Sequence, residues 1–194
     1  MSKVIYRMMM SLDGLINDRE GKTDPLYKDF DSFGKSTTMK DYIATVGAVV
    51  MGRVTYEMAE DPDWYADNYE HQVPLYVVTR HPPEKHPREN DRLKFNFMAD
   101  GVESAIAQAK RSAGERAVAI VGGASIAKQA MELALIDELH IDVMPVLLCK
   151  GLRLFGDLDL AALELERMRV GEVANGRTQL VYRVQKGEAT DRKV

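Results

Sequence analysis

The sequence predicts an α/β protein whose sheet is mixed but mostly parallel. Three short runs are apolar at every position, a pattern typical of strands buried on both faces of a sheet that helices cover. Near the C-terminus, two segments of alternating polarity, about 163–173 and 177–184, flank Asn175-Gly176, which is a strong signal for a β-hairpin. We therefore expect parallel central strands and an antiparallel hairpin at the C-terminal edge. The three apolar runs are residues 46–51, 75–78 and 117–121.

The first half of the chain alternates strand signals with polar, glycine-punctuated stretches. Residues 4–10 have the β-branched and aromatic content of a strand, and Asp13-Gly14 ends that strand with a turn. The polar stretch 17–35 predicts a loop that covers part of the fold, and 62–74 predicts a second loop, which carries Trp64. The other elements expected here are short helices at 36–44 and 53–60 and strands at 46–51 and 75–78.

The second half contains the clearest helix and a strand-helix-strand unit. Three prolines within 81–87 exclude regular structure there. Asp100 and Glu103 predict the capped start of a helix that ends at Gly114. Segment 117–144 predicts two parallel strands joined by a helix, a crossover that is nearly always right-handed. The remaining elements expected are strands at 94–98 and 138–144 and a helix at 126–134.

Composition limits the class of protein. The chain has 194 residues, 45% of them hydrophobic, which predicts one domain at 1–184 and a charged, disordered tail at 185–194. With 26 basic and 30 acidic side chains the formal net charge is −4, which disfavours binding to nucleic acid or to a membrane surface. Cys149 is the single cysteine, and no apolar run is long enough to span a bilayer, so we expect a cytoplasmic protein without disulfides.

Gly122-Gly123 joins a buried strand to a helix. Glycines let a ligand approach the backbone closely, and a helix N-terminus carries unpaired N–H groups and partial positive charge, which together suit a phosphate. The alternative for such a glycine pair is a turn that binds nothing. The pair by itself therefore leaves both possibilities open.

A second strand-to-helix junction lies at Gly52-Arg53. Arg53 and the hydroxyl of Thr55 are expected at the start of a helix, where a cation is unfavourable unless an anion lies beside it. Thr79-Arg80 ends the next strand. Because the carboxyl ends of parallel strands meet at one edge, these features together predict an anion-binding edge, with a solvated arginine as the alternative for Arg53.

Five short motifs follow one another along the chain. Their order and spacing resemble those of the dihydrofolate-reductase-like superfamily, and the chain is most similar to the reductase domain of the bifunctional riboflavin-biosynthesis protein and its stand-alone relatives, over roughly residues 3–184. The resemblance implies a three-layer α/β/α fold that binds NADPH along the sheet edge. The motifs are Ser11-Leu12-Asp13-Gly14, Met51-Gly52-Arg53-Val54-Thr55-Tyr56-Glu57, Val78-Thr79-Arg80, Val121-Gly122-Gly123-Ala124-Ser125, and Asp137-Glu138-Leu139 leading to 145–155.

The resemblance also implies roles for individual residues, carried over position by position. The arginines would favour NADPH over NADH, because a guanidinium group matches a phosphate bidentately. The residues implied for cofactor phosphates are Gly52, Arg53 and Thr55, those for the adenosine 2′-phosphate are Thr79 and Arg80, and those for the pyrophosphate are Gly122, Gly123, Ala124, Ser125 and Ile126. The residues implied beside the nicotinamide and substrate are Met9, Met10, Asp13 and Trp64.

Several candidate side chains have two interpretations. Asp13 is either an acid near the reacting centre or a turn aspartate that bonds nearby backbone. Trp64 either lines the pocket or pins its loop to the core. His140 shares a strand face with two acids but lacks a fourth ligand, so we expect no metal site. Cys149, at a position where the family has glycine, is expected to be a small packed thiol.

The predicted function is an NADPH-dependent reductase of a small heterocyclic, pterin- or pyrimidine-like, or imine-bearing substrate. The alternative is a non-catalytic nucleotide-binding module on the same fold. Folate reductases carry an acid near the position of Ser36, and this sequence has none there, so dihydrofolate itself is not the expected substrate. A phosphate site for a riboflavin-pathway substrate is also not identified. We expect a homodimer paired through a sheet edge, with Leu139, Ile141 and Val143 on the edge strand.

Overall fold

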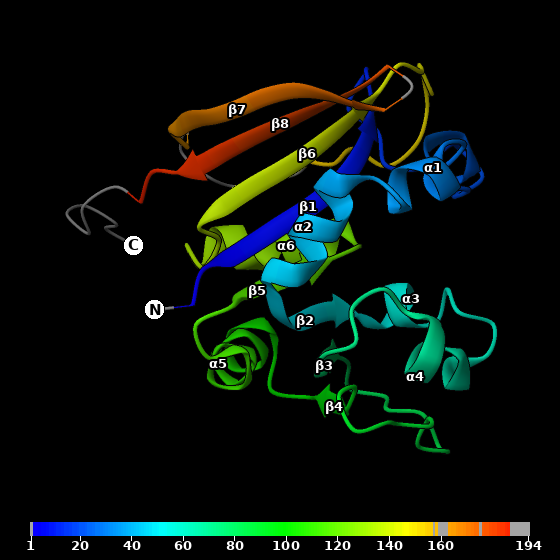
Figure 1. The fold of residues 1–194 in the computed structure, drawn as a ribbon, viewed down its shortest axis with the longest axis vertical. Helices are drawn as coiled ribbons and strands as arrows, with labels where there is room; N and C mark the ends of the chain where they lie inside the picture. The colour runs from blue at the N-terminus through cyan, green and yellow to red at the C-terminus, as the bar shows by residue number, and fades with distance from the viewer. Residues whose placement is uncertain (1, 157, 159–162, 175, 187–194) are drawn as a thin grey trace.

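Within the residues described, eight strands form one continuous sheet (Figure 1). The computed structural model describes residues 2–156, 158, 163–174 and 176–186. The strands are β1 (Val4–Ser11), β2 (Val46–Gly52), β3 (Leu75–Val78), β4 (Phe95–Met98), β5 (Ala117–Val121), β6 (Glu138–Met144), β7 (Leu165–Ala174) and β8 (Arg177–Val184). Their order is β4-β3-β2-β5-β1-β6-β8-β7, with parallel pairs from β4 to β6 and antiparallel pairs for β6-β8 and β8-β7. The predicted mixed sheet with an antiparallel C-terminal edge is confirmed.

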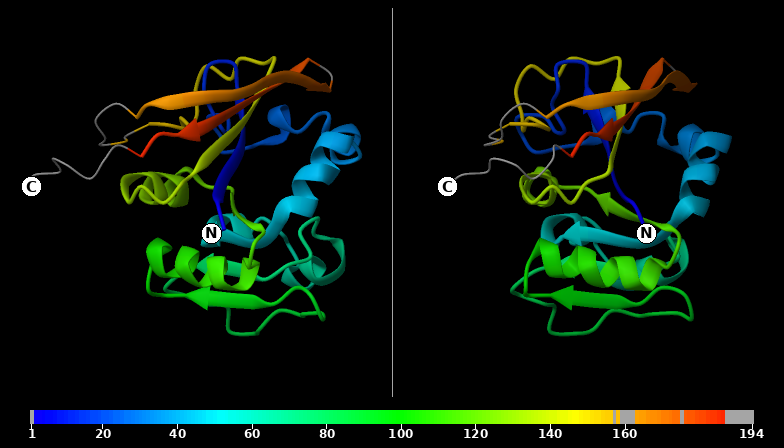
Figure 2. Two further views of the ribbon diagram at one scale, coloured as in Figure 1. Left: turned by 60° about the vertical axis from the view of Figure 1, so that its left-hand side comes forward. Right: turned by 90° about the vertical axis from the view of Figure 1, so that its left-hand side faces the viewer.

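Helices cover both faces of the sheet, so the predicted three-layer α/β/α fold is also confirmed. Figure 2 shows α5 (Val102–Ala113) and α6 (Ala124–Glu132) on one side and α2 (Thr37–Thr45) on the other. In the described part of the chain, no helix has the length and apolar character needed to cross a membrane. The remaining short helices are α1 (Phe30–Gly34), α3 (Arg53–Tyr56), α4 (Tyr65–Asn68), η1 (Asp24–Leu26) and η2 (Pro62–Trp64).

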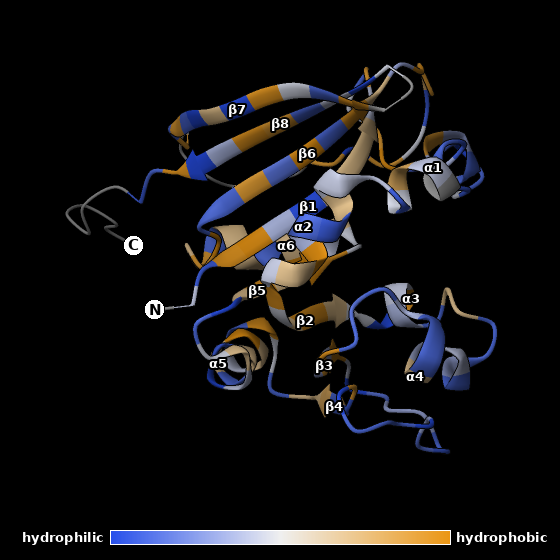
Figure 3. Cartoon of the chain, viewed as in Figure 1, coloured by the Kyte–Doolittle hydropathy of each residue, from blue (hydrophilic) through white to orange (hydrophobic). Residues whose placement is uncertain are grey.

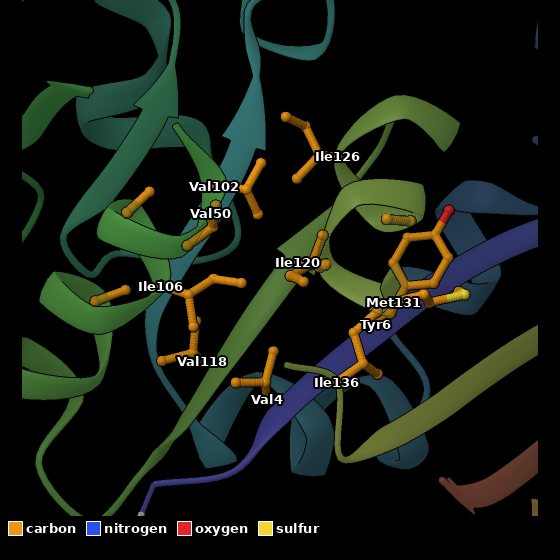
Figure 4. Close-up of a cluster of buried hydrophobic side chains, with 14 of the residues drawn as sticks. Val4, Tyr6, Val50, Val102, Ile106, Val118, Ile120, Ile126, Met131 and Ile136 are labelled. Carbon is orange, nitrogen blue, oxygen red and sulfur yellow. The ribbon is translucent and has the colours of Figure 1, made fainter. Parts of the chain in front are cut away.

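The core has two layers because neighbouring residues of each strand point to opposite faces of the sheet. On β2, Val50 packs in the cluster that includes α5 and α6, while Val49 and Met51 pack in the opposite cluster with α2. Figure 4 shows the first cluster, with Val50 close to side chains from β5 and α5. Hydrophobic residues run along β2, whereas hydrophilic and hydrophobic residues alternate along β7 and β8 (Figure 3). A strand buried on both faces needs apolar side chains throughout, and an edge hairpin does not.

The two long loops are more structured than the sequence predicts. Segment 17–35 contains η1 and α1, and segment 62–74 contains η2 and α4. Each of these elements is five residues or shorter, too short to show a helical repeat of apolar positions. The helix expected at 53–60 is shorter than predicted, because α3 forms only one turn, at Arg53–Tyr56.

The start of α5 also differs from the prediction. Gly101, with φ of +91°, is the residue before the first helical turn, and no side chain caps the helix. The expected cap at Asp100 is therefore wrong by one position. By contrast, α2 begins as predicted, because the hydroxyl of Ser36 accepts a hydrogen bond from the backbone N–H of Met39 at 3.2 Å.

The expected dimer edge is not available. The strand that carries Leu139, Ile141 and Val143 is β6, which is hydrogen-bonded to β1 on one side and to β8 on the other. Among the described strands the outermost are β4 and β7. Because β8 pairs with β6, this strand has no free edge for pairing with a second chain, and the predicted homodimer is left without that edge.

The chain beyond β8 begins with ordered contacts. The backbone N–H of Gln185 donates to the carbonyl of Glu164 at 2.9 Å, and Lys186 forms an ion pair with Asp137. The expected disordered tail at 185–194 is therefore wrong for its first two residues, and 187–194 lie outside the described residues. Asn175 of the predicted hairpin turn also lies outside them, whereas Gly176 has φ of +78°.

Candidate active site

A cavity of about 840 Å³ lies beside the C-terminal halves of β1, β2 and β5. Met8 and Met9 of β1, Met51 of β2 and Val121 of β5 contribute to its wall. The loop after β1 and the segment 58–71, which contains η2 and α4, contribute further residues, as do α2, α3, β6 and the turn after β5. Ligands of open α/β sheets collect at the carboxyl ends of parallel strands, which is where this cavity lies.

Two glycine-led junctions meet at the cavity. Gly122 has φ of +73° and lies so close to Thr55 that a Cβ atom on it would be 2.2 Å from the threonine Oγ1. Gly52 is similarly close to Ile126, whose Cγ1 would be 3.0 Å from an added Cβ. Because β2 and β5 are neighbours in the sheet, the start of α3 packs directly against the start of α6. At Gly122 only a residue without a side chain permits this approach, whereas at Gly52 an added Cβ atom would be tight against Ile126.

Buried charges hold the inner part of the cavity together. Arg7 of β1 donates from Nε and Nη2 to the Asp142 carboxylate of β6, at 3.1 and 2.9 Å. Asp142 is fully buried and also accepts from the side-chain amide of Gln179 at 3.0 Å. Arg177 lies 3.9 Å from the same carboxylate and pairs with Asp29. Each buried charge therefore has an opposite charge beside it, as burial requires.

Aromatic and imidazole rings pack beside the buried ion pair of Arg7 and Asp142. The Arg7 guanidinium lies 4.5 Å from the ring centroid of Tyr42, whose ring is 5.7 Å from that of His71. The ring centroid of Tyr69 lies 5.6 Å from that of His71. We call Arg7, Tyr42, Tyr69, His71 and Asp142 the inner cluster, and all five residues line the cavity.

The inner cluster contains buried polar atoms that lack a partner. In the described residues, Tyr42 Oη, Tyr69 Oη and His71 Nδ1 have no hydrogen bond. Burial, and secondarily the positive charge of Arg7, lowers the pKa of His71 to about 4, so the imidazole is neutral at pH 7. Unpaired buried polar atoms are costly, which makes a ligand that bonds to them favourable.

Glu70 is a carboxylate that faces the cavity without a basic partner. Its side chain lines the cavity and is exposed, yet desolvation by the surrounding protein raises its pKa. No Lys or Arg side chain in the described part of the chain forms an ion pair with it. A raised pKa with no opposing cation marks a carboxylate whose environment favours either a proton or a cationic ligand.

The structure brings some of the predicted site residues together and leaves others outside the cavity. Thr55, Gly122, Gly123, Met9 and Trp64 line it. Trp64 is 46% exposed and makes an edge-to-face contact with the Tyr65 ring at 5.8 Å. The predicted residues that do not line the cavity are Gly52, Arg53, Thr79, Arg80, Ala124, Ser125, Ile126, Met10 and Asp13.

Asp13 is a turn residue. Its carboxylate accepts hydrogen bonds from the Ser11 hydroxyl at 2.6 Å and from the backbone N–H groups of Leu148 and Cys149 at 3.1 and 2.8 Å. These bonds, that of Ser11 first, lower the pKa of Asp13 to about 2. The carboxylate thus joins the turn after β1 to the loop after β6, and the interpretation that places it at the reacting centre has no support in its position.

Cys149 and His140 also have definite places. Cys149 is exposed, so the expected packed thiol is wrong, and its φ of +64° explains why glycine suits this position. His140 Nε2 lies 3.0 Å from Glu138 Oε2. In the described residues no group of three or more potential ligands could hold a metal ion.

Sequence reasoning missed the inner cluster. Arg7 lies in the mostly apolar strand β1 and Asp142 lies in the neighbouring strand β6, so opposite charges in these two strands are a signal for a buried pair. Arg177 follows the hairpin turn and has the sequence context of an exposed residue. His71 and Glu70 belong to an irregular segment whose position depends on distant contacts.

Comparison with known proteins identifies the family. The family model described as the RibD C-terminal domain matches residues 2–178. The chain belongs to the RibD C-terminal domain family. This family member is 30% identical over 156 residues to a curated relative, the uncharacterized protein YwjB of Bacillus subtilis, and the match covers 80% of this chain and 84% of YwjB. It is 24% identical over 189 residues to YyaP of the same organism, covering 93% and 94% of the two chains.

Solved structures share the fold of this RibD C-terminal domain family member. A putative riboflavin biosynthesis protein from Shewanella sp. PV-4 has a TM-score of 0.76 at 26% identity, covering 95% of this chain and 99% of that one. The diaminohydroxyphosphoribosylaminopyrimidine deaminase/5-amino-6-(5-phosphoribosylamino)uracil reductase of Thermotoga maritima has a TM-score of 0.68 at 16% identity, covering 95% and 57%. Dihydrofolate reductase from Enterococcus faecalis, complexed with NADP(H), has a TM-score of 0.56 at 19% identity, covering 94% and 96%. The class of enzyme that the family indicates is a reductase.

Proposed function

We propose that this protein is an NADPH-dependent reductase of a small heterocyclic, pterin- or pyrimidine-like, or imine-bearing substrate. The observation that supports it most is the contact between Thr55 and Gly122, which places two glycine-led strand-to-helix junctions side by side at one cavity. Membership of the RibD C-terminal domain family supports a reductase, and the NADP(H) complex of the Enterococcus enzyme supports the choice of cofactor.

The residues present fit the cofactor. At Gly123, which precedes the first turn of the nine-residue helix α6, an added Cβ atom would meet only Thr55 Oγ1, at 3.7 Å, so the backbone beside this helix N-terminus is open. Such a surface offers unpaired N–H groups to a pyrophosphate. The side chains of Thr79 and Arg80 follow β3, two strands from β5 in the sheet. We assign the cofactor to Gly52, Arg53, Thr55, Thr79, Arg80, Gly122, Gly123, Ala124, Ser125 and Ile126.

Arg53 is available to a phosphate despite its present partner. It forms an i,i+4 ion pair with Glu57 at 2.9 Å, and both side chains are about half exposed. An exposed pair of this kind contributes about 0.3–0.5 kcal/mol, so a bound phosphate competes with it easily.

The cofactor and the protein would have different roles in the reaction. NADPH supplies the hydride when bound. The chain orients the reacting groups and limits water, with Met9 on β1 and the rings of Trp64 and Tyr65 as apolar walls of the cavity. The uncharged members of the inner cluster, Tyr42, Tyr69 and His71, provide hydrogen-bonding groups for a polar heterocycle.

The test is a titration of the protein with NADPH and NADH, followed by nicotinamide fluorescence and then by oxidation in the presence of pterin, pyrimidine and imine compounds. We expect NADPH to bind more tightly than NADH and at least one compound class to be reduced. Tight binding without oxidation across the panel would support the alternative, a nucleotide-binding module. Absence of binding to either coenzyme would refute the proposal.

A variant locates the 2′-phosphate. Arg53→Ala should weaken NADPH about tenfold while changing NADH affinity little, because a charge-assisted contact contributes about 1.5–3 kcal/mol. Arg111→Ala, which removes a basic side chain from the last turn of α5, is the control. Equal losses for both coenzymes would contradict the assignment of Arg53 to the 2′-phosphate.

A further inference from the structure

The cavity has few positive charges and several negative ones. In the described lining, Arg7 is the single Lys or Arg side chain. The acidic side chains of the lining are Glu60, Asp61, Glu70 and Asp142. Asp142 belongs to the inner cluster and Glu70 precedes its His71 in the chain, so with Arg7 one basic and two acidic groups give this inner part a formal charge of −1, apart from the junctions assigned to the cofactor phosphates. A phosphate-bearing substrate would bring a further negative charge into this cavity.

The positive charges near the inner cluster are already neutralised. Arg7 is 8% exposed and directs Nε and Nη2 to Asp142, with ring faces of Tyr42 and Phe33 at 4.5 and 5.2 Å from its Cζ atom. Arg177 is fully buried, pairs with Asp29 and does not line the cavity. Phosphate recognition requires basic donors that can turn toward the ligand; Arg177 cannot do so without breaking its buried ion pair, and Arg7 already directs two of its donor groups to Asp142.

The inner cluster instead offers neutral hydrogen-bonding groups. Tyr42 is 7% exposed, Tyr69 8% and His71 2%, and each carries an unpartnered polar atom while lining the cavity. The three atoms are closed off from solvent in this structure, and a rotation of their side chains toward the cavity would let two hydroxyls and a neutral imidazole donate to and accept from the N–H, C=O or ring nitrogen groups of an uncharged heterocycle. They have no net charge with which to balance a phosphate dianion.

Glu70 adds a preference for positive charge. Its carboxylate is accessible from the cavity, and no described basic side chain pairs with it. Trp64, which is 46% exposed, shares the lining, and an indole ring attracts a cation to its face. Carboxylate and ring faces together suit a protonated or quaternary nitrogen.

We infer that the inner part of this cavity selects a substrate that carries no phosphate and is uncharged or cationic at its reducible nitrogen-containing group, with Glu70 as the residue that sets this selection. The inference rests on the proposed function, because it names the substrate class of the same site. The Thermotoga relative acts, by its name, on a phosphoribosylamino compound, so the two proteins would differ in substrate although they share a fold.

A cationic imine also satisfies the balance of the reaction. Hydride from NADPH adds to the carbon of the C=N⁺ group, the π electrons of that bond become the nitrogen lone pair, and the products are a neutral amine and NADP⁺. No separate proton donor is needed for this step. An uncharged imine would require one proton from solvent or from a protonated Glu70.

The experiment has two stages, so that the two proposals can fail separately. Binding of NADPH to the wild-type protein is measured first and tests the proposed function alone. The protein saturated with NADP⁺ is then titrated by calorimetry with cytidine, with cytidine 5′-monophosphate and with the permanent cation N-methyl-3,4-dihydroisoquinolinium. We expect cytidine to bind at least about tenfold more tightly than its monophosphate, and the cation to bind.

Glu70→Gln is the variant that tests the selecting residue, and Glu103→Gln, on the exposed face of α5, is the control for the loss of one negative charge. Glu70→Gln should weaken the cation about tenfold and narrow the difference between cytidine and its monophosphate, because a charge-assisted contact is lost. Glu103→Gln should change neither. Tighter binding of the monophosphate, an unchanged ratio in Glu70→Gln, or no binding of any probe to a protein that binds NADPH would overturn the inference and leave the proposed function standing.

Discussion

Arg177 and Asp29, which are 148 positions apart in the sequence, form a buried ion pair that joins the C-terminal hairpin to the start of α1. The Arg177 side chain is fully buried, and its Cζ atom lies 3.8 Å from the ring centroid of Phe33. Removing one member of such a pair leaves the other charge buried without a partner. We therefore expect this contact to be a principal link between the first and last segments of the fold.

Asp29→Asn should lower the free energy of unfolding by about 3–5 kcal/mol, the cost typical of breaking a buried ion pair from one side. The measurement is urea-induced unfolding followed by circular dichroism. Glu166→Gln is the matched control, because it neutralises one side of the exposed pair with Arg183, whose contribution is below about 1 kcal/mol. Similar losses in the two variants would show that burial does not determine the strength of the Asp29 contact.

Gly122→Ala should destabilise the protein and abolish tight NADPH binding. The new methyl group would lie 2.2 Å from Thr55 Oγ1 and would require a φ of +73°. The overpacking should cost about 1–3 kcal/mol in addition to the strain of the positive φ. Thermal unfolding and the fluorescence titration with NADPH measure the two effects.

Gly123→Ala distinguishes the effect of a positive φ from the effect of a steric clash with Thr55. Gly123 also has a positive φ, of +38°, but an added Cβ would meet only Thr55 Oγ1, at an ordinary 3.7 Å. Gly123→Ala should therefore lower the free energy of unfolding less than Gly122→Ala does, by the cost of overpacking. If Gly123→Ala is as damaging as Gly122→Ala, close packing of the two junctions does not explain the need for glycine at position 122.

The sheet was predictable because its signals are local. An apolar run such as 117–121 must be buried on both faces, and the hairpin signal at Asn175-Gly176 specifies an antiparallel pair without reference to the rest of the chain. The elements α1 and α4 were not predictable, because a single turn shows no repeat and tertiary contacts stabilise it.

The candidate site divides in the same way. The junction at Gly122 could be predicted, since two glycines between a buried strand and a helix are visible in the sequence. The contact of Tyr42 with His71 could not, because it joins α2 to the segment before β3 and depends on how both pack over the sheet. The part of the site that we propose for the substrate is therefore the part that sequence patterns describe least.

Asp13→Asn should leave the reductase rate nearly unchanged while loosening the loop after β6. Its carboxylate accepts the backbone N–H groups of Leu148 and Cys149, which an amide can satisfy only in part. Because the pKa of Asp13 is lowered to about 2, its contribution is complete above the usual value near 3.8 and is lost as the pH falls toward 2.

Limited proteolysis of the loop around Leu148, compared with steady-state turnover at pH 7, measures the two effects of Asp13→Asn separately. Faster cleavage with turnover retained supports the structural role. A large loss of turnover with an unchanged rate of cleavage would restore Asp13 as an acid at the reacting centre.

His71 should make the stability of the protein fall as the pH is lowered from about 6.5 to about 4. Burial lowers the pKa of the folded imidazole to about 4, whereas the unfolded chain binds the proton near the usual value of 6.5. Between these two pH values unfolding takes up a proton, so acid favours the unfolded state, by about 3 kcal/mol over the whole window.

Urea unfolding at several pH values measures this slope, and His71→Gln should flatten it. Glu70, whose raised pKa gives a slope of opposite sign, is present in both proteins and cancels in the comparison. His86→Gln, which replaces an exposed ring, should keep the wild-type slope, and an equally steep slope in His71→Gln would mean that this imidazole is not held neutral in the folded protein.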